Sequence, residues 1–134
     1  MAENPLTTRF IDALGKLERT NDVDDLASLF AEDAELVSPE VRGRSTTEAE
    51  QFWRSYRAQF DNVQSDFGQV EDSGRTAVLE WTSRGTLATG RPIEYAGVSL
   101  LTVEDGRVTR FATYYDTAAF VAPDGGGAGS QGAS

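Results

Sequence analysis

The residues best suited to chemistry lie near the C-terminal end of the chain, at Tyr114-Tyr115-Asp116. There a carboxylate follows two aromatic residues at the end of a β-rich run. In general, an apolar pocket makes a carboxyl group hold its proton more tightly, which suits proton transfer near neutral pH. Asp116 is therefore the candidate general acid or base. The alternative is that Asp116 caps the turn before a short helix at residues 117–120.

Two residue types that dominate enzyme chemistry are missing, because the 134 residues include no histidine and no cysteine. Their absence excludes a Ser-His-Asp triad, a thiol nucleophile and metal sites built on His or Cys. Proton transfer is left to Asp, Glu, Tyr, Lys or water. No glycine-rich phosphate loop lies between a strand and a helix, so we expect no cofactor and no metal.

The composition is typical of one globular domain, with 39% hydrophobic and 25% charged residues. A formal net charge of −10 disfavours nucleic acid and anionic membrane surfaces as partners. No apolar run approaches the ~20 residues of a membrane helix, and the N-terminus has no signal-peptide pattern, so we expect a cytoplasmic location. We predict one domain over residues 1–121 and a flexible Gly/Ser/Ala-rich tail over residues 122–134.

Helical patterns occupy most of the first half of the sequence. Apolar residues at spacings of three and four predict helices over residues 6–18 and 46–60. A shorter helix is predicted after Asp22, which can cap it. Residues 45–48 have the pattern of a capping box. A short strand that ends at Pro39 is predicted between the second and third helices.

From residue 63 onward the pattern changes to the period of two that is typical of strands. Strands are predicted over residues 64–71 and 76–84, with Trp81 on the better inward face of the second. Two further strands flank Asp105-Gly106, which predicts a hairpin with a type I′ turn.

This order of elements predicts an α+β fold. We expect a curved, mixed or antiparallel sheet of four to six strands, wrapped over three N-terminal helices. Such a sheet and its helices form a cone that encloses an apolar pocket, which is a favoured place for a small-molecule site.

Three motifs along the chain resemble those of a known family. They are Leu29-Phe30-Ala31-Glu32-Asp33-Ala34 before Pro39 and Gly43, Trp81 before Gly85, and Gly97 through Asp105-Gly106-Arg107-Val108 to Tyr114-Tyr115-Asp116. In these motifs, over about residues 6–120, the chain resembles the SnoaL-like group of the nuclear-transport-factor-2-like superfamily. That superfamily includes polyketide cyclases, ketosteroid isomerases and limonene epoxide hydrolases, so the resemblance implies the fold more strongly than any one activity.

The resemblance to ketosteroid isomerases does not extend to their catalytic residues. Their catalytic Tyr corresponds to Phe10, which has no hydroxyl to donate. Their catalytic Asp corresponds to Ser38, which is not a base near neutral pH. Their oxyanion-holding Asp falls near Gly97 or Val98. Steroid isomerisation by that mechanism is therefore disfavoured.

The last strand resembles that of limonene epoxide hydrolases, and Asp116 matches one of their two catalytic Asp positions. Their Arg and other Asp should lie on the 76–84 strand, where this chain has Trp81 and Ser83. A register shifted by one residue would place Glu80 there as a second carboxylate, without the Arg. The Asp-Arg-Asp relay is therefore incomplete.

Two functions remain open. One is a cofactor-free isomerase, cyclase or hydrolase in which a single carboxylate acts on an apolar metabolite, as the SnoaL-type resemblance implies for Asp116. The other is a non-catalytic ligand-binding or dimerisation module. We expect a small apolar organic ligand and a homodimer formed through the sheet. The expected binding residues are Tyr114, Trp81, Tyr56, Phe10, Trp53, Tyr95 and Glu80.

Overall fold

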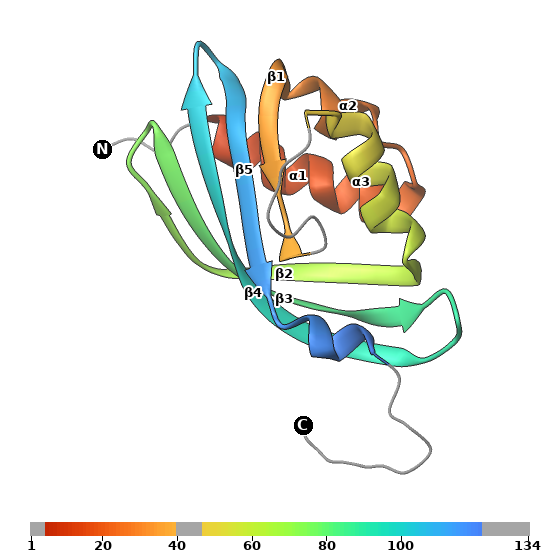
Figure 1. Ribbon diagram of the computed structural model, residues 1–134. Helices are drawn as coiled ribbons and strands as arrows, with labels where there is room; N and C mark the ends of the chain where they lie inside the picture. The colour runs from red at the N-terminus through yellow and green to blue at the C-terminus, as the bar shows by residue number, and fades with distance from the viewer. Residues whose placement is uncertain (1–4, 40–46, 122–134) are drawn as a thin grey trace.

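The computed structural model describes residues 5–39 and 47–121 (Figure 1). Two expectations fall outside these residues: the start of the capping box at Ser45 and the tail at 122–134. In chain order the elements are α1 (Pro5–Thr20), α2 (Asp24–Ser28), β1 (Phe30–Val37), α3 (Ala49–Ala58), β2 (Phe60–Asp72), β3 (Thr76–Leu87), β4 (Pro92–Glu104), β5 (Arg107–Tyr115) and the 3₁₀ helix η2 (Thr117–Phe120).

The five described strands form one mixed sheet in the order β1-β5-β4-β3-β2. The pairs β2–β3, β3–β4 and β4–β5 are antiparallel, whereas β1 runs parallel to β5. The helices α1, α2 and α3 lie together on one side of the sheet, and β3 and β4 curve around that side (Figure 1). The α+β class and the curved mixed sheet predicted from the sequence are confirmed.

The helices form where apolar side chains recur at helical spacing, and their ends differ from the predicted ones by a few residues. α1 continues to Thr20, two residues beyond the predicted end. The predicted cap, Asp22, lies one residue before the N-cap of α2, which is Val23 and makes no side-chain cap hydrogen bond. Asp22 accepts a hydrogen bond from the backbone N–H of Asp24 at 3.0 Å. None of the described helices is long and apolar enough to cross a membrane.

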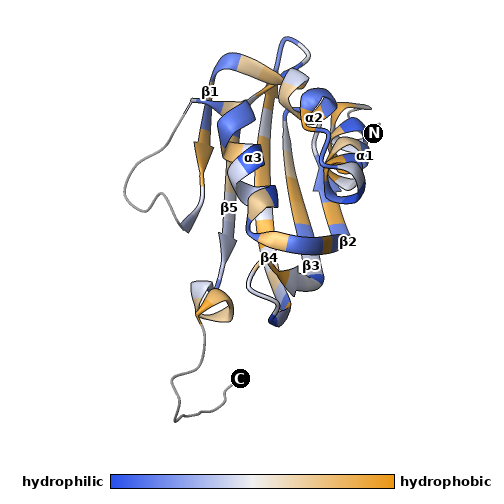
Figure 2. Cartoon of the chain, turned by 90° about the vertical axis from the view of Figure 1, so that its right-hand side faces the viewer, coloured by the Kyte–Doolittle hydropathy of each residue, from blue (hydrophilic) through white to orange (hydrophobic). Residues whose placement is uncertain are grey.

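The alternation on β3 sets which face of the sheet is inside. Trp81 is 8% exposed and Leu79 is fully buried, whereas Val78 is 38% exposed and Glu80 points to solvent. The inward face predicted for this strand is therefore confirmed. Figure 2 shows the same alternation of hydrophobic and hydrophilic residues along the strands beneath the helices.

Two local features of the β3–β4–β5 region depend on glycine. Asp105 and Gly106 have φ of 53° and 75°, the positive values that the predicted type I′ turn requires. Gly97 pairs with Trp81 across the strands, and a Cβ on Gly97 would lie 2.5 Å from the Trp81 indole. The absence of a side chain at Gly97 thus gives the Trp81 ring room to lie against β4.

The interior contains two groups of packed side chains. One group joins α1, α2 and α3 to the sheet, with Phe10, Trp53 and Phe111 near its centre. The other lies toward the far ends of β2, β3 and β4 and includes Trp81 and Tyr95. Figure 2 shows all three α-helices on the same side of the strands. Between the two groups the packing leaves the cavity described next.

Candidate ligand pocket

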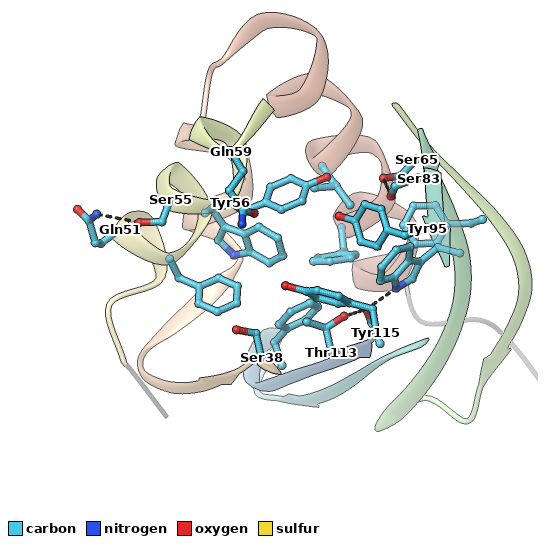
Figure 3. Close-up of a pocket in the computed structure, with 18 residues that line it drawn as sticks. Ser38, Gln51, Ser55, Tyr56, Gln59, Ser65, Ser83, Tyr95, Thr113 and Tyr115 are labelled. Atoms are coloured by element: carbon cyan, nitrogen blue, oxygen red, sulfur yellow. Dashed lines mark hydrogen bonds between the residues drawn. The ribbon is translucent and has the colours of Figure 1, made fainter. Parts of the chain in front are cut away.

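A cavity of about 270 Å³ lies between the concave face of the sheet and the helices α1 and α3. Its wall consists of aromatic rings and uncharged polar side chains (Figure 3). The aromatic and aliphatic members are Phe10, Leu14, Phe52, Trp53, Tyr56, Phe67, Trp81, Tyr95, Phe111 and Tyr115. The polar members are Ser38, Gln51, Ser55, Gln59, Ser65, Ser83, Ser99 and Thr113.

The aromatic wall is fixed by contacts between ring edges and ring faces. Trp53 lies 5.0 Å from Phe111 and 5.9 Å from Phe10 between ring centroids, both in edge-to-face orientation. On the other side, Tyr95 makes edge-to-face contacts at 5.3 Å with both Trp81 and Tyr115. Such pairs are favourable beyond the area that they bury, so they stabilise this arrangement of the wall.

No carboxylate, ammonium or guanidinium group belongs to the wall as far as the structure describes the chain. The same part of the chain contains no cluster of side chains suited to a metal ion. A ligand in the cavity would therefore meet rings, hydroxyls and amides directly.

One buried carboxylate lies directly behind this wall. Glu18 of α1 is only 6% exposed. Its Oε2 atom accepts hydrogen bonds from the Tyr56 hydroxyl and the Ser65 hydroxyl, each at 2.6 Å. Its Oε1 atom accepts one from the Ser65 backbone N–H at 2.9 Å. The Ser65 hydroxyl is also 2.6 Å from that of Ser83. Glu18 thus joins α1 to α3, β2 and β3 through hydroxyls that line the cavity.

The position of Tyr56 beside Glu18 changes the pKa of its phenol. Burial raises the pKa of the Tyr56 phenol well above its ordinary value of 10.0, and the negative charge of Glu18 raises that pKa further. The phenol therefore keeps its proton at neutral pH, and its O–H donates a hydrogen bond to Glu18.

A second chain of hydrogen bonds lies on the strands β3, β4 and β5. The Trp81 indole N–H donates to the Ser99 hydroxyl at 2.9 Å, and that hydroxyl is 2.8 Å from the Thr113 hydroxyl. Figure 3 shows Thr113, at one end of this series of hydrogen bonds, at a different place on the pocket wall from Ser65 and Ser83.

Five of the residues expected from the sequence to bind ligand are brought together around the cavity. These are Phe10, Trp53, Tyr56, Trp81 and Tyr95. They come from α1, α3, β3 and β4, so only the fold makes them neighbours.

The other three expected site residues lie elsewhere. Tyr114 is 50% exposed, and Glu80 is exposed on the outer face of the sheet. Asp116 is exposed, and its carboxylate accepts a hydrogen bond from the Ala118 backbone N–H at 2.9 Å, as the N-cap of η2. This is the capping arrangement given above as the alternative. In that position the Asp116 carboxylate does not face the cavity.

The reason for this correction is strand parity. Tyr115 shares its face of β5 with Phe111 and Thr113 and lines the pocket, whereas Tyr114 points the opposite way. Two adjacent tyrosines give no hint of which one faces inward. The expected site therefore missed Tyr115.

Sequence reasoning also missed Glu18. Glu18 lies four residues after Leu14, and thus on the apolar stripe of α1. A charged residue on the buried face of an amphipathic helix is the signal that could have identified it.

Comparisons with known proteins agree with this fold. The family model of the SnoaL-like domain matches residues 7–111. A search of curated proteins found no match. Among solved structures, an NTF2-like protein from Anabaena variabilis ATCC 29413 has a TM-score of 0.75 at 15% identity, over 86% of this chain and 90% of that one. TerC co-crystallized with polyporic acid has a TM-score of 0.69 at 19% identity, over 87% and 95% of the two chains. An LEH-like epoxide hydrolase of M. tuberculosis has a TM-score of 0.67 at 14% identity, over 87% of each. At these identities the solved structures show a shared fold.

Proposed function

Since the chain belongs to the SnoaL-like domain family, we propose that it binds a small, largely aromatic organic molecule in the cavity and holds it without acid or base chemistry at Asp116. One observation carries this proposal: the described wall is made of aromatic rings and neutral polar groups. A volume of about 270 Å³ is slightly below the roughly 300–1,000 Å³ of small-molecule sites. The ligand is therefore of two or three rings.

A single-carboxylate isomerase, cyclase or hydrolase needs a carboxyl group within hydrogen-bond reach of the substrate. Asp116 is committed to the cap of η2 and lies on the surface. Glu18 lies behind Tyr56 and Ser65 and would act only through them. Binding is therefore the function that the geometry supports better than catalysis.

The two tryptophans of the chain provide the test, because Trp53 and Trp81 both line the cavity. We expect 1,4-naphthoquinone to quench the tryptophan emission in a saturable manner. Its reaction with thiols does not interfere, because the chain has no cysteine.

Leu14→Phe places a larger side chain on the cavity wall and should weaken this quenching at least tenfold in apparent affinity. Val78→Phe makes a similar addition on the exposed outer face and should leave the affinity unchanged. Circular dichroism checks that both variants are folded. Non-saturable quenching, or equal affinity in both variants, would contradict the proposal.

We also propose a homodimer formed through the outer face of the sheet. Val78, Val98 and Tyr114 are exposed there at 38%, 36% and 50%. Val98 and Tyr114 pair directly across β4 and β5. Contiguous exposed apolar side chains on a sheet face are favourable sites for association.

Tyr114→Glu should convert this dimer to a monomer, because it places a charge in the proposed interface. Val121→Glu is the matched control, since Val121 is even more exposed at 67% but lies beyond η2. Light scattering coupled to size-exclusion chromatography gives the mass of each. A monomeric wild-type protein at micromolar concentration would refute the dimer.

A further inference from the structure

The two hydrogen-bond chains at the pocket begin with opposite kinds of group. The first begins at the carboxylate of Glu18, which has no proton to donate. Every hydroxyl bonded to it must point its proton at it, as Tyr56 and Ser65 do. Since the single hydroxyl proton of Ser65 is used on Glu18, the 2.6 Å contact between Ser65 and Ser83 must use the proton of Ser83.

The protons of all three hydroxyls are therefore directed away from the cavity. Tyr56 and Ser83 line the cavity, and their hydroxyl oxygens keep lone pairs that can accept a hydrogen bond. At this end the wall can accept hydrogen bonds from a ligand, but the three hydroxyls have no proton to give. A ligand oxygen without a proton gains no hydrogen bond from these three hydroxyls, so a ligand group that donates binds better beside them.

The second chain begins at the indole N–H of Trp81, which can only donate. It donates to Ser99, and the contact between Ser99 and Thr113 uses one of their two hydroxyl protons. The other proton remains on Ser99 or on Thr113, and both of these side chains line the cavity. Within the described part of the chain neither hydroxyl makes a further hydrogen bond, so this end of the pocket has a proton to donate.

We propose that the pocket selects a ligand that carries a hydroxyl or N–H group at one end and a carbonyl oxygen at the other. The hydroxyl donates to the lone pairs of Tyr56 and Ser83, and the carbonyl accepts from the Ser99–Thr113 pair. The ligand class is thus a hydroxyaryl ketone or a related hydroxylated carbonyl compound with an aromatic body. This inference rests on the proposed binding function and adds the chemistry and orientation of the ligand.

Isothermal titration calorimetry with three related probes tests the proposal. 6-Acetyl-2-naphthol has both groups, its methyl ether has lost the donor, and 6-ethyl-2-naphthol has lost the carbonyl. We expect 6-acetyl-2-naphthol to bind roughly tenfold more tightly than either of the other two.

The methyl ether is larger than the naphthol, so its weaker binding could come from its size or from the lost hydrogen bond. Variants of the protein distinguish these two causes. In Glu18→Gln the side chain gains an N–H₂ donor. The hydroxyl protons of Tyr56, Ser65 and Ser83 are then no longer all directed along the hydrogen bonds toward residue 18. The preference for the naphthol over its ether should shrink to about twofold. Asp12→Asn is the matched control, because it removes the same charge from an exposed position on α1. Asp12→Asn should keep the full preference.

Ser83→Ala provides a second route if Glu18→Gln does not fold. It removes one acceptor that faces the cavity and leaves the bonds between Ser65 and Glu18 in place. It should lower the affinity for the naphthol and leave that for the ether unchanged.

Three results would overturn the inference, and they are distinguishable. If the naphthol and its ether bind equally, the ligand preference is wrong while the binding function stands. If Glu18→Gln and Asp12→Asn show the same preference, the preference does not come from the Glu18 chain. If none of the probes binds to wild-type protein, the proposed binding function fails as well.

Discussion

Glu18 and Asp116 carry the same chemical group and lie in opposite surroundings. Glu18 is 6% exposed and accepts three hydrogen bonds from residues that are 38 and 47 positions away in the sequence. Asp116 is exposed and accepts one hydrogen bond from a backbone N–H two positions away. The first carboxylate connects elements that are distant in sequence, whereas the second stabilises the start of a single turn.

This difference shows how the function of a carboxylate depends on its partners. The partners of Glu18 are hydroxyls that also line the cavity, so its charge orients the protons of the pocket wall. The partner of Asp116 is a backbone group at the surface, so its charge affects the local turn. Substitutions at the two positions should therefore differ in both stability and ligand binding.

The largest effect is expected at Glu18. Glu18→Ala leaves the hydroxyls of Tyr56 and Ser65 and the Ser65 N–H without their buried acceptor. We expect the free energy of unfolding to fall by about 3 kcal/mol, since each unsatisfied buried group costs roughly 1–3 kcal/mol. Urea denaturation measures this. Asp12→Ala on the same helix is the control, and it should change stability by less than about 0.5 kcal/mol. Equal costs at the two positions would mean that the Glu18 network does not stabilise the fold.

Tyr56→Phe should have an intermediate effect and a distinctive pH dependence. Loss of the hydrogen bond to Glu18 should cost about 1.5 kcal/mol near neutral pH. The pKa of the Tyr56 phenol is raised above 10.0 in the folded protein by burial first and then by Glu18. The stability that Tyr56 contributes is therefore complete below about pH 10. It is lost as the pH rises from there through the higher folded pKa.

Denaturation of both proteins between pH 9 and about 11 reveals this loss. The free energy of unfolding of the wild type should fall more steeply above pH 10 than that of Tyr56→Phe. If the two curves are parallel over the whole range, Tyr56 does not titrate as its buried position implies.

Features that depend on local spacing could be predicted from the sequence. The apolar stripe of α1, the inward face of Trp81 and the Asp105-Gly106 turn each depend on a few neighbouring residues. Such patterns reflect the geometry of one helix, one strand or one hairpin, and they are independent of the rest of the chain.

The site itself could be predicted only in part. The aromatic residues Phe10, Trp53 and Trp81 were expected in the pocket because large rings are usually buried. The Glu18 network could not be derived, because it joins residues from α1, α3 and β2 that only the tertiary fold brings together. Asp116 follows two tyrosines in the sequence, but the alternation of β5 turns the ring of Tyr115, one residue earlier, into the pocket.

The smallest effect is expected at Asp116. Asp116→Ala removes the cap of η2 and should cost about 1 kcal/mol. Asp116→Asn retains a capping oxygen and should cost a few tenths of a kcal/mol. Neither variant should alter the affinity for 6-acetyl-2-naphthol, because the Asp116 side chain does not line the cavity.

Calorimetry and urea denaturation of the same samples measure ligand affinity and stability separately. If Asp116→Asn abolishes ligand binding while stability is kept, the Asp116 carboxylate must reach the ligand in solution. The comparison with Glu18 would then be reversed, because the surface carboxylate would be the functional one.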